Sequence, residues 1–392
     1  HYPLRRQRQM CIRDSHYCFG NISQRHKKLL SNQLFLSRKC SILETLRLIN
    51  CTKYLNCVFA VQIPIFVSMF QNPNFQKMDE FSERKEPFFF LINFLMDEVR
   101  IFTKNEIKNK ALLIDFPHIT NDIDCHPERS RCVEWKSFPE TLEDYKKGFK
   151  IVQNNIRKGN SYLTNYTTKT EIETNLSLED IFRFSKAKYK VLFKDEFVFF
   201  SPETFVEIVD NKIFTHPMKG TIDAEIEDAE NILKNDPKEK AEHYTVVDLL
   251  RNDLSMVADN VQVKEFQRID YIKTKQKNLL AMSSEIEGEI KPEYQNKIGT
   301  ILQKLLPAGS ILGAPKPKTL EIILEAERYE RGFYTGIAGY FDGQNLDSCV
   351  MIRFIEKENE RLFFKSGGGI THQSDLASEY EEMKNKIYVP IY

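Results

Sequence analysis

The chain lacks an excess of charge of either sign, because its 56 Lys and Arg residues balance 56 Asp and Glu residues. A protein that binds nucleic acid or an anionic membrane surface normally carries a basic surplus, so neither partner is indicated. Internal repeats and low-complexity tracts are also lacking. The composition, 41% hydrophobic and 29% charged, is typical of a soluble globular protein. A length of 392 residues suffices for one large core or two ordinary ones.

Cysteines with metal-binding spacing are absent as well. None of the eight cysteines belongs to a Cys-x-x-Cys motif or a Cys/His ligand pattern, and five of them fall within the first 57 residues. This distribution disfavours both a zinc site and a disulfide framework. Residues 78–392 therefore fit a reducing cytoplasm.

No apolar run is long enough to predict a transmembrane helix. Residues 54–70 come nearest, but they contain Asn56, Gln62 and Pro64. They also lie too far into the chain for an ordinary signal peptide.

Residues 1–77 differ from the rest of the chain. They are basic, contain only Asp14 and Glu44 as acids, and show no sustained helical or strand period. The chain begins with His, and the run from Arg5 to Ser15 resembles translated adapter sequence. We therefore expect residues 1–77 to be translated upstream sequence, with Met78 as the true start. The alternative is a poorly ordered targeting or anchoring arm.

From Met78 onward the apolar pattern predicts an α+β fold with antiparallel sheets. Strands are expected at 88–95, 161–168, 189–193, 197–201, 204–209 and 212–215, and in a meander at 332–341, 346–356 and 361–366. Helices are expected at 140–157, 176–187, 224–235, 237–250, 292–305, 316–329 and 374–387, the last with Ser374 as its N-cap.

The chemistry-bearing residues begin with Lys219, in a short link expected between an apolar strand and an acidic helix. Two glutamate pairs follow on expected helices, Glu239 with Glu242 and Glu379 with Glu382. Residues three apart on a helix share a face, and like charges placed there are mildly destabilising unless a cation binds between them. Carboxylates without Cys or His partners favour Mg²⁺. The alternative is a surface lysine beside two solvated helix faces.

Three further features support an anion site less specifically. Lys386 follows Glu382 by four residues, which fits either a helical ion pair or a partner for a substrate carboxylate. Residues 366–370, Ser-Gly-Gly-Gly-Ile, lie between an expected strand and the last helix, and glycines there would let amides approach an anion. Residues 306–316 form a small-residue loop that would suit close packing or a ligand wall.

Six segments in this order resemble the chorismate-utilising enzymes: HPMKGT, AEHYTVVDLLRND, LLPAGSILGAPK, GFYTGIAGYF, SGGGIT and SEYEEMKNK. The resemblance covers residues 140–392 and implies a chorismate-binding catalytic domain there. Residues 78–139 match weakly and are expected to form its N-terminal part. The implied fold is one α+β domain of two stacked antiparallel β-sheets with flanking helices.

Within that family, Lys219 resembles the PIKGT signature of aminodeoxychorismate synthase component I. Leu163 stands where the water-activating isochorismate and salicylate synthases carry a lysine base, which disfavours that branch. The resemblance therefore implies amination of chorismate to 4-amino-4-deoxychorismate, for p-aminobenzoate and folate synthesis. The alternatives are anthranilate synthase component I and a catalytically silent chorismate-binding scaffold subunit.

The resemblance also implies roles for individual residues. Lys219 would attack ring C2 as a covalent nucleophile, and Glu203 would act as general acid on the leaving hydroxyl. Glu242 and Glu382 match direct Mg²⁺ ligands, and Glu239 and Glu379 match partners that act behind these ligands or through water. The residues that match substrate-binding positions are Gly220, Thr221, Ser310, Tyr334, Arg353, Gly367, Gly369 and Lys386.

Ammonia needs a source, and the sequence contains no glutaminase signature. The family solution is a separate glutamine amidotransferase subunit, which we expect as a partner. Two positions depart from the family pattern: Leu312 replaces a polar residue, and Ala281 stands where relatives carry Gln or His. Both departures bear on how the substrate is positioned.

Overall fold

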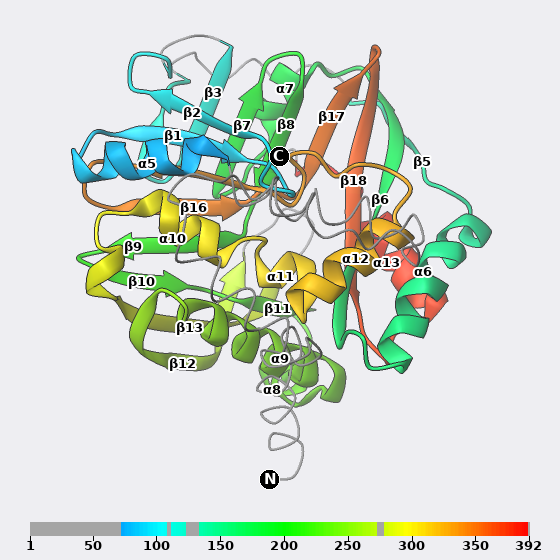
Figure 1. Cartoon of the computed structure of the whole chain (residues 1–392). Helices are drawn as coiled ribbons and strands as arrows, with labels where there is room; N and C mark the ends of the chain where they lie inside the picture. Colours follow the sequence, from blue (N-terminus) through cyan, green and yellow to red (C-terminus); the bar gives the residue numbers. More distant parts are fainter. Residues whose placement is uncertain (1–71, 108–110, 123–132, 273–277, 391–392) are drawn as a thin grey trace, which may run out of the picture. The chain divides into compact units, whose positions relative to one another are not determined.

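Two nine-stranded antiparallel sheets form the centre of the described chain. The computed structural model describes residues 72–107, 111–122, 133–272 and 278–390 (Figure 1). Residues 1–71, to which the expectation about upstream sequence mainly applies, lie outside this range.

The first sheet, sheet A, combines the first two strands of the described chain with strands from its middle and later parts. Its order is β11 (Met218–Asp223), β13 (Leu279–Ile290), β10 (Lys212–Thr215), β9 (Thr204–Val209), β16 (Leu346–Val350), β15 (Ile337–Phe341), β1 (Phe88–Ile92) and β2 (Val99–Thr103), and β12 (Ala258–Ile272) pairs with β13.

The second sheet, sheet B, contains the long strand pair β6 with β18. Its order is β14 (Gly313–Ala314), β6 (Leu163–Thr174), β18 (Arg361–Ile370), β17 (Phe354–Glu358), β8 (Phe197–Ser201), β7 (Tyr189–Phe193), β3 (Leu112–Phe116) and β4 (Ile119–Thr120), and β5 (Trp135–Phe138) pairs with β6.

Helices cover the outer face of each sheet. One hydrophobic cluster joins sheet A to α5 (Pro73–Glu83), α9 (Pro237–Leu254), α10 (Ile298–Leu305) and α11 (Gly309–Leu312). Another joins sheet B to α6 (Leu142–Arg157), α7 (Leu178–Phe184), α12 (Lys316–Ala326) and α13 (Leu376–Asn385). The remaining helical segments are α8 (Ala229–Asn235) and the 3₁₀ turn η1 (Pro292–Tyr294).

A third cluster, rich in aromatic residues, fills the space between the two sheets. Strand β1 is apolar at every position because both of its faces are buried. Phe88 and Phe90 pack into the cluster on the helix side of sheet A, whereas Phe89 and Leu91 pack into the cluster between the sheets. Alternate side chains of a strand point to opposite faces, so a strand buried on both faces must be apolar throughout.

The expected α+β class with two antiparallel sheets is confirmed, and so are the strands expected at 204–209 and 212–215, which Asp210 and Asn211 join in a hairpin. Both of these residues have positive φ, 50° and 61°, which is the geometry of a tight two-residue turn. Helix α5 begins at Pro73, so it spans the boundary expected at Met78, whose side chain is buried. No described helix is both long and apolar enough to cross a membrane.

Several predicted elements were wrong in detail. The helix expected at 224–235 begins at Ala229, and the one expected at 292–305 divides into η1 and α10. The last helix is capped by Asp375 rather than Ser374, because the Asp375 carboxylate accepts from the amides of Ala377 and Ser378. The long hairpin of β12 and β13 was not predicted at all.

Candidate active site

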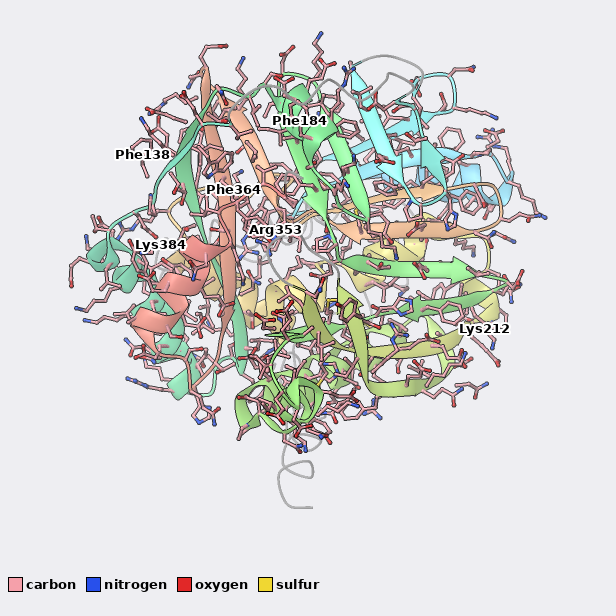
Figure 2. The ribbon with its side chains drawn as sticks, turned by 180° about the vertical axis from the view of Figure 1, so that it is seen from behind. Phe138, Phe184, Lys212, Arg353, Phe364 and Lys384 are labelled. Carbon is pink, nitrogen blue, oxygen red and sulfur yellow. The ribbon has the colours of Figure 1, made fainter. Side chains whose placement is uncertain are left out.

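The site lies where the chain passes twice between the two sheets. Residues 202–203 connect β8 of sheet B to β9 of sheet A, and residues 351–353 connect β16 of sheet A to β17 of sheet B. The two crossings are hydrogen-bonded to each other, through Val350 N to Glu203 O at 3.1 Å and Phe200 N to Arg353 O at 3.2 Å. Arg353 marks this place in Figure 2.

A pocket of about 710 Å³ opens beside these crossings. All fourteen residues proposed for the site from the sequence line this pocket, although they are spread along the chain from Glu203 to Lys386. They are Glu203, Lys219, Gly220, Thr221, Glu239, Glu242, Ser310, Tyr334, Arg353, Gly367, Gly369, Glu379, Glu382 and Lys386. The structure therefore brings the predicted set together, while the role of each residue stays a prediction.

Lys219 lies on a strand and not in the link that the sequence suggested. It belongs to β11, which pairs with β13, and the register shifts between Met218 and Thr221. Such a bulge re-aims the side chains of the bulged residues. Gly220 has φ of +77°, a backbone region that glycine adopts without steric cost. The bulge accounts for how Lys219, on an edge strand, comes to line the pocket.

The first glutamate pair is placed by the start of helix α9. The Asp236 side chain accepts from the amide of Glu239, and Pro237 occupies the first turn. Glu239 thus lies in the first helical turn, where the helix dipole stabilises negative charge. Glu242 follows three residues later and lines the same pocket.

The second pair is placed by helix α13, which packs on β18. Glu379 is almost fully buried at 3% exposure, whereas Glu382 is exposed. Lys386 donates to Glu382 Oε1 at 2.8 Å and to the carbonyl of Gly367 at 2.8 Å. Both of its expected roles stay open, because the ion pair is present and the ammonium also lines the pocket.

The carboxylate oxygens of the pocket suit a hard cation, but the described carboxylates do not converge into a complete metal site. A Cβ added at Gly368 would lie 3.5 Å from Glu379 Oε2 and from Glu382 Oε1, and 3.6 Å from Lys386 Nζ. This glycine therefore leaves room between carboxylates, which are ligands that Mg²⁺ prefers. Across the described ranges, however, no three Asp, Glu, His or Cys side chains converge closely enough to hold a metal by themselves.

Glu203 has the electrostatics expected of a proton donor. Burial raises the pKa of its carboxyl, while Lys219, a hydrogen bond from Ser310 and Lys386 each oppose that rise. The Ser310 hydroxyl donates to Glu203 Oε1 at 2.9 Å. A carboxyl with a raised pKa keeps its proton at a pH where an ordinary glutamate is ionised.

Arg353 was expected on a strand but lies in the second crossing, with φ of 53°. Its Nη1 donates to the carbonyl of Lys386 at 2.9 Å, and its guanidinium lies 4.8 Å from the centre of the Tyr388 ring. Sequence reasoning missed Tyr388, which also lines the pocket. No local signal identified it, because it follows the last helix in a segment without a recognisable pattern.

The glycine run was expected as a loop but continues strand β18. Gly367, Gly368 and Gly369 pair in register with residues 165–167 of β6. A Cβ added at Gly367 would lie 2.3 Å from the carbonyl oxygen of Tyr166. Gly367 is therefore required for close approach of the two strands.

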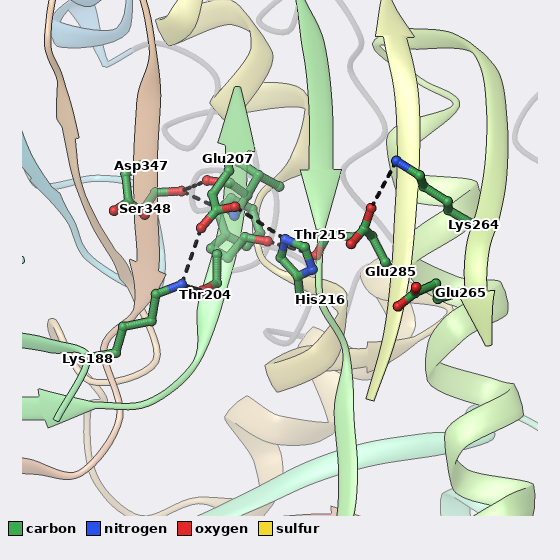
Figure 3. A network of polar contacts seen from close by, with 12 residues as sticks. Lys188, Thr204, Glu207, Thr215, His216, Lys264, Glu265, Glu285, Asp347 and Ser348 are labelled. Atoms are coloured by element: carbon green, nitrogen blue, oxygen red, sulfur yellow. Dashed lines mark hydrogen bonds and ion pairs between the residues drawn. The ribbon is translucent and has the colours of Figure 1, made fainter. Parts of the chain in front are cut away.

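The strand that leads to Lys219 is anchored by a polar network (Figure 3). His216 Nε2 lies 3.2 Å from Glu207 Oε2, and Lys188 Nζ lies 3.2 Å from Glu207 Oε1. The hydrogen bond with His216 is the main cause that lowers the pKa of Glu207 to about 2. Glu207 is therefore ionised at any ordinary pH and joins β9 to the segment before β11.

The two positions that depart from the family pattern, Ala281 and Leu312, are buried, and so is Leu163, which disfavoured the water-activating branch. Ala281 pairs with Thr221 across β13 and β11, and Leu163 packs so that a Cβ added at Gly369 would lie 2.9 Å from its Cδ1. Leu312 is fully buried on α11. Each presents an alkyl group where a polar side chain was expected from relatives, so none can activate a water molecule.

A family model described as chorismate binding enzyme matches residues 91–391. An uncharacterised PabA-like protein of Haemophilus influenzae is 49% identical over 317 residues, which cover 81% of this chain and 96% of that protein.

Two solved structures share the fold. The menaquinone-specific isochorismate synthase of Escherichia coli aligns with a TM-score of 0.61 and 16% identity, over 80% of this chain and 79% of that chain. Anthranilate synthase component I of Streptococcus pneumoniae aligns with a TM-score of 0.54 and 25% identity, over 70% of this chain and 61% of that chain. The first of these likenesses concerns the fold alone.

Proposed function

Because the chain belongs to the chorismate binding enzyme family, we propose that it converts chorismate and ammonia to 4-amino-4-deoxychorismate and water. The observation that carries this proposal is the placement of Lys219 in the β11 bulge, lining one pocket with Glu203 and both glutamate pairs. An amine nucleophile, an acid for the leaving group and anionic groups for a cation are the components that this reaction needs.

The proposed reaction has two displacement steps. The neutral amine of Lys219 forms a bond to ring C2, both ring double bonds shift, and the C4 hydroxyl leaves with the proton of Glu203 as water. Ammonia then forms a bond to C4, both double bonds return, and the lysine amine leaves C2. The ammonium formed at C4 gives one proton back to Glu203. Splitting one difficult substitution into two easier ones is the general advantage of covalent catalysis.

The substrate carboxylates need cationic partners in the pocket. We assign Arg353 and Lys386 to this role, because both line the pocket and neither is deeply buried. A guanidinium can bind a carboxylate through two parallel hydrogen bonds. Tyr334, which is 4% exposed, and the polar groups of Thr221 and Ser310 would orient the ring.

Mg²⁺ would be held by Glu242 and Glu382, with Glu239 and Glu379 behind them. When bound, the ion would neutralise a substrate carboxylate and orient the ring. Because no three of these carboxylates converge in the described chain, the substrate would have to supply some of the ligands.

The ammonia would come from a glutamine amidotransferase partner, and the reaction would occur in the cytoplasm as part of p-aminobenzoate and folate synthesis. A thiol such as the buried, unpaired Cys349 suits a reducing compartment. Free ammonium at high concentration should replace the partner in a test tube, because the proposed chemistry consumes ammonia alone.

The test is turnover of chorismate by the full chain with Mg²⁺ and an ammonium salt, with products identified by chromatography and mass. We expect 4-amino-4-deoxychorismate, and we expect Lys219→Ala to lose most of that activity. Lys212→Ala is the matched control, because Lys212 is an exposed lysine on β10 outside the pocket.

The same assay separates the alternatives. Anthranilate as the product would identify the chemistry in the name of the Streptococcus pneumoniae relative. Absence of any product, with chorismate still bound, would identify a silent scaffold subunit. Either result contradicts the proposal.

A further inference from the structure

Helix α9 also carries Asp253, a buried carboxylate that the proposed reaction does not use. Asp253 lies eleven residues after Glu242, which is close to three helical turns, so the two share one side of the helix. Asp253 is only 8% exposed and does not line the pocket. A buried carboxylate at this position needs partners.

Its partners come from the segment that leads from α10 through α11 to the start of α12. Lys316 Nζ lies 2.9 Å from Asp253 Oδ2, and the amide of Gly309 donates to the same carboxylate. Lys316 Nζ also donates to the carbonyl of Leu305 at 2.7 Å. Asp253 and Lys316 thus close residues 305–316 into a fixed loop.

This loop carries the hydrogen-bond donor to Glu203. Ser310 follows Gly309 directly and donates to Glu203 Oε1 at 2.9 Å. Asp253 also lies close against the loop, since a Cβ added at Gly309 would lie 2.8 Å from Asp253 Oδ2. From Asp253 to Glu203 there are therefore two hydrogen bonds and one residue step.

We propose that Asp253 and Lys316 are positioning residues that hold Ser310 against Glu203 and so tune the proton donor of the reaction. This inference rests on the proposed function for its kinetic consequence, but the positioning itself depends only on the contacts given above. A purely structural ion pair is the competing explanation, because truncating one partner of a buried pair is strongly destabilising.

The charged and titratable groups around Glu203 decide in which direction its pKa moves when the Ser310 hydrogen bond is lost. Lys219 on β11 and Lys386 after α13 oppose the effect of burial, as does the Ser310 hydrogen bond. Tyr334 and Cys349 also lie within electrostatic reach. Since the hydrogen bond favours the ionised carboxylate, its loss raises the pKa of Glu203 further.

The experiment compares Asp253→Asn, Lys316→Met and Ser310→Ala in the full chain. The first readout is the pH dependence of turnover with ammonium, where the limb at high pH reports deprotonation of the proton donor. We expect each variant to move that limb upward by about half to one pH unit. Asp253→Asn should add no further shift when Ser310→Ala is already present, because it acts through Ser310.

The second readout needs no turnover. Infrared difference spectra of the wild type against Glu203→Gln follow the protonated carboxyl of Glu203 without substrate. In Asp253→Asn and Ser310→Ala this band should persist to higher pH. Asp248→Asn is the control, because Asp248 lies on the same helix in an exposed pair with Arg251.

The proposal is overturned if Asp253→Asn and Lys316→Met lower the melting temperature but leave both the infrared titration and the pH limb in place. It is also overturned if the shifts from Asp253→Asn and Ser310→Ala add in the double variant. If the wild type does not turn over chorismate, the proposed function fails, and the infrared titration still decides the positioning role.

Discussion

The carbonyl of Glu203 accepts a hydrogen bond of 3.1 Å from the amide of Val350. This bond ties together the two segments in which the chain passes between the sheets, and each segment carries a residue assigned to the reaction. Glu203 precedes β9, and Arg353 precedes β17. The proposed proton donor and the proposed carboxylate partner are thus held by one backbone connection between rigid sheets, which is how a precise site is best supported.

Glu203→Gln should lower kcat by about 10² to 10⁴, the usual contribution of a positioned general acid. The reason is that glutamine cannot protonate the leaving hydroxyl. Because burial raises the pKa of Glu203, the wild type should stay active above the pH where an ordinary glutamate ionises, and the variant should lose that limb of the profile. Steady-state kinetics across pH decide the matter, and an unchanged kcat would remove Glu203 from the reaction.

Removal of Mg²⁺ should abolish turnover reversibly. Glu242→Gln and Glu382→Gln should each raise the Mg²⁺ concentration needed for half-maximal rate by about 10-fold or more, since each removes a charged ligand. Glu321→Gln is the control, because Glu321 lies on α12 outside the pocket, in an exposed pair with Lys318. Equal Mg²⁺ requirements in all three variants would show that the ion binds elsewhere.

Two neighbouring glycines should respond differently to alanine. In Gly367→Ala the new Cβ would lie 2.3 Å from a backbone carbonyl, so β6 and β18 must separate. We expect a loss of about 2 kcal/mol or more in unfolding free energy, as overpacking typically costs.

Gly368→Ala should leave stability nearly unchanged, because its nearest contacts at 3.5 Å are ordinary van der Waals distances. It should instead raise the Mg²⁺ requirement, since the methyl group enters the space between Glu379 and Glu382. Denaturant unfolding and Mg²⁺ titration of both variants test the pair. A stable Gly367→Ala would contradict the strand spacing described here.

Glu207 should make stability depend on pH in the acid range. Its pKa is lowered from 4.5 to about 2 in the folded protein, so its contribution is complete above about pH 4.5 and is lost as the pH falls toward 2. Glu207→Gln should reduce the change in unfolding free energy across that pH window by an amount on the order of 1 kcal/mol, after allowing for solvent screening. The denaturant midpoint, measured at each pH, follows this change. Glu230→Gln, in an exposed pair with Lys234, should leave this pH dependence unchanged. Identical slopes for wild type and Glu207→Gln would refute the network's electrostatic role.

Tyr388→Ala should raise KM for chorismate by about 3- to 10-fold with little change in kcat, because the ring holds the Arg353 guanidinium 4.8 Å from its centre. Tyr388→Phe keeps the ring and should behave as the wild type. A matched loss in both variants would instead assign importance to the phenolic hydroxyl.

The sequence predicted the site better than the local structure around it. All fourteen site residues line one pocket because ordered motifs identify a family independently of the elements that carry them. The predicted secondary structure was wrong at Lys219 and at Gly367–Gly369, which were expected in connecting segments but lie on strands. Glycines within a strand lower its apparent propensity, and a bulge or close approach between strands is set by pairing that a local pattern does not contain.

Long-range contacts explain the remaining errors. The hairpin of β12 and β13 carries many polar residues and several register shifts, so it gave no clean alternation. Asp253 and Tyr388 were not singled out, because their partners lie at least 35 positions away in Gly309, Lys316 and Arg353. Burial of Asp253 becomes visible only when the 305–316 segment folds back on α9.

The most direct test of the account is to look for the covalent bond at Lys219. The full chain is incubated with chorismate and Mg²⁺ without ammonia, quenched in acid, and digested for peptide mapping by mass spectrometry. The account predicts a modification equal to chorismate less one water on Lys219, absent in Lys219→Ala and discharged by ammonium before the quench. Formation of 4-amino-4-deoxychorismate by a wild type that never carries this modification, or by Lys219→Ala at the full rate, would contradict it.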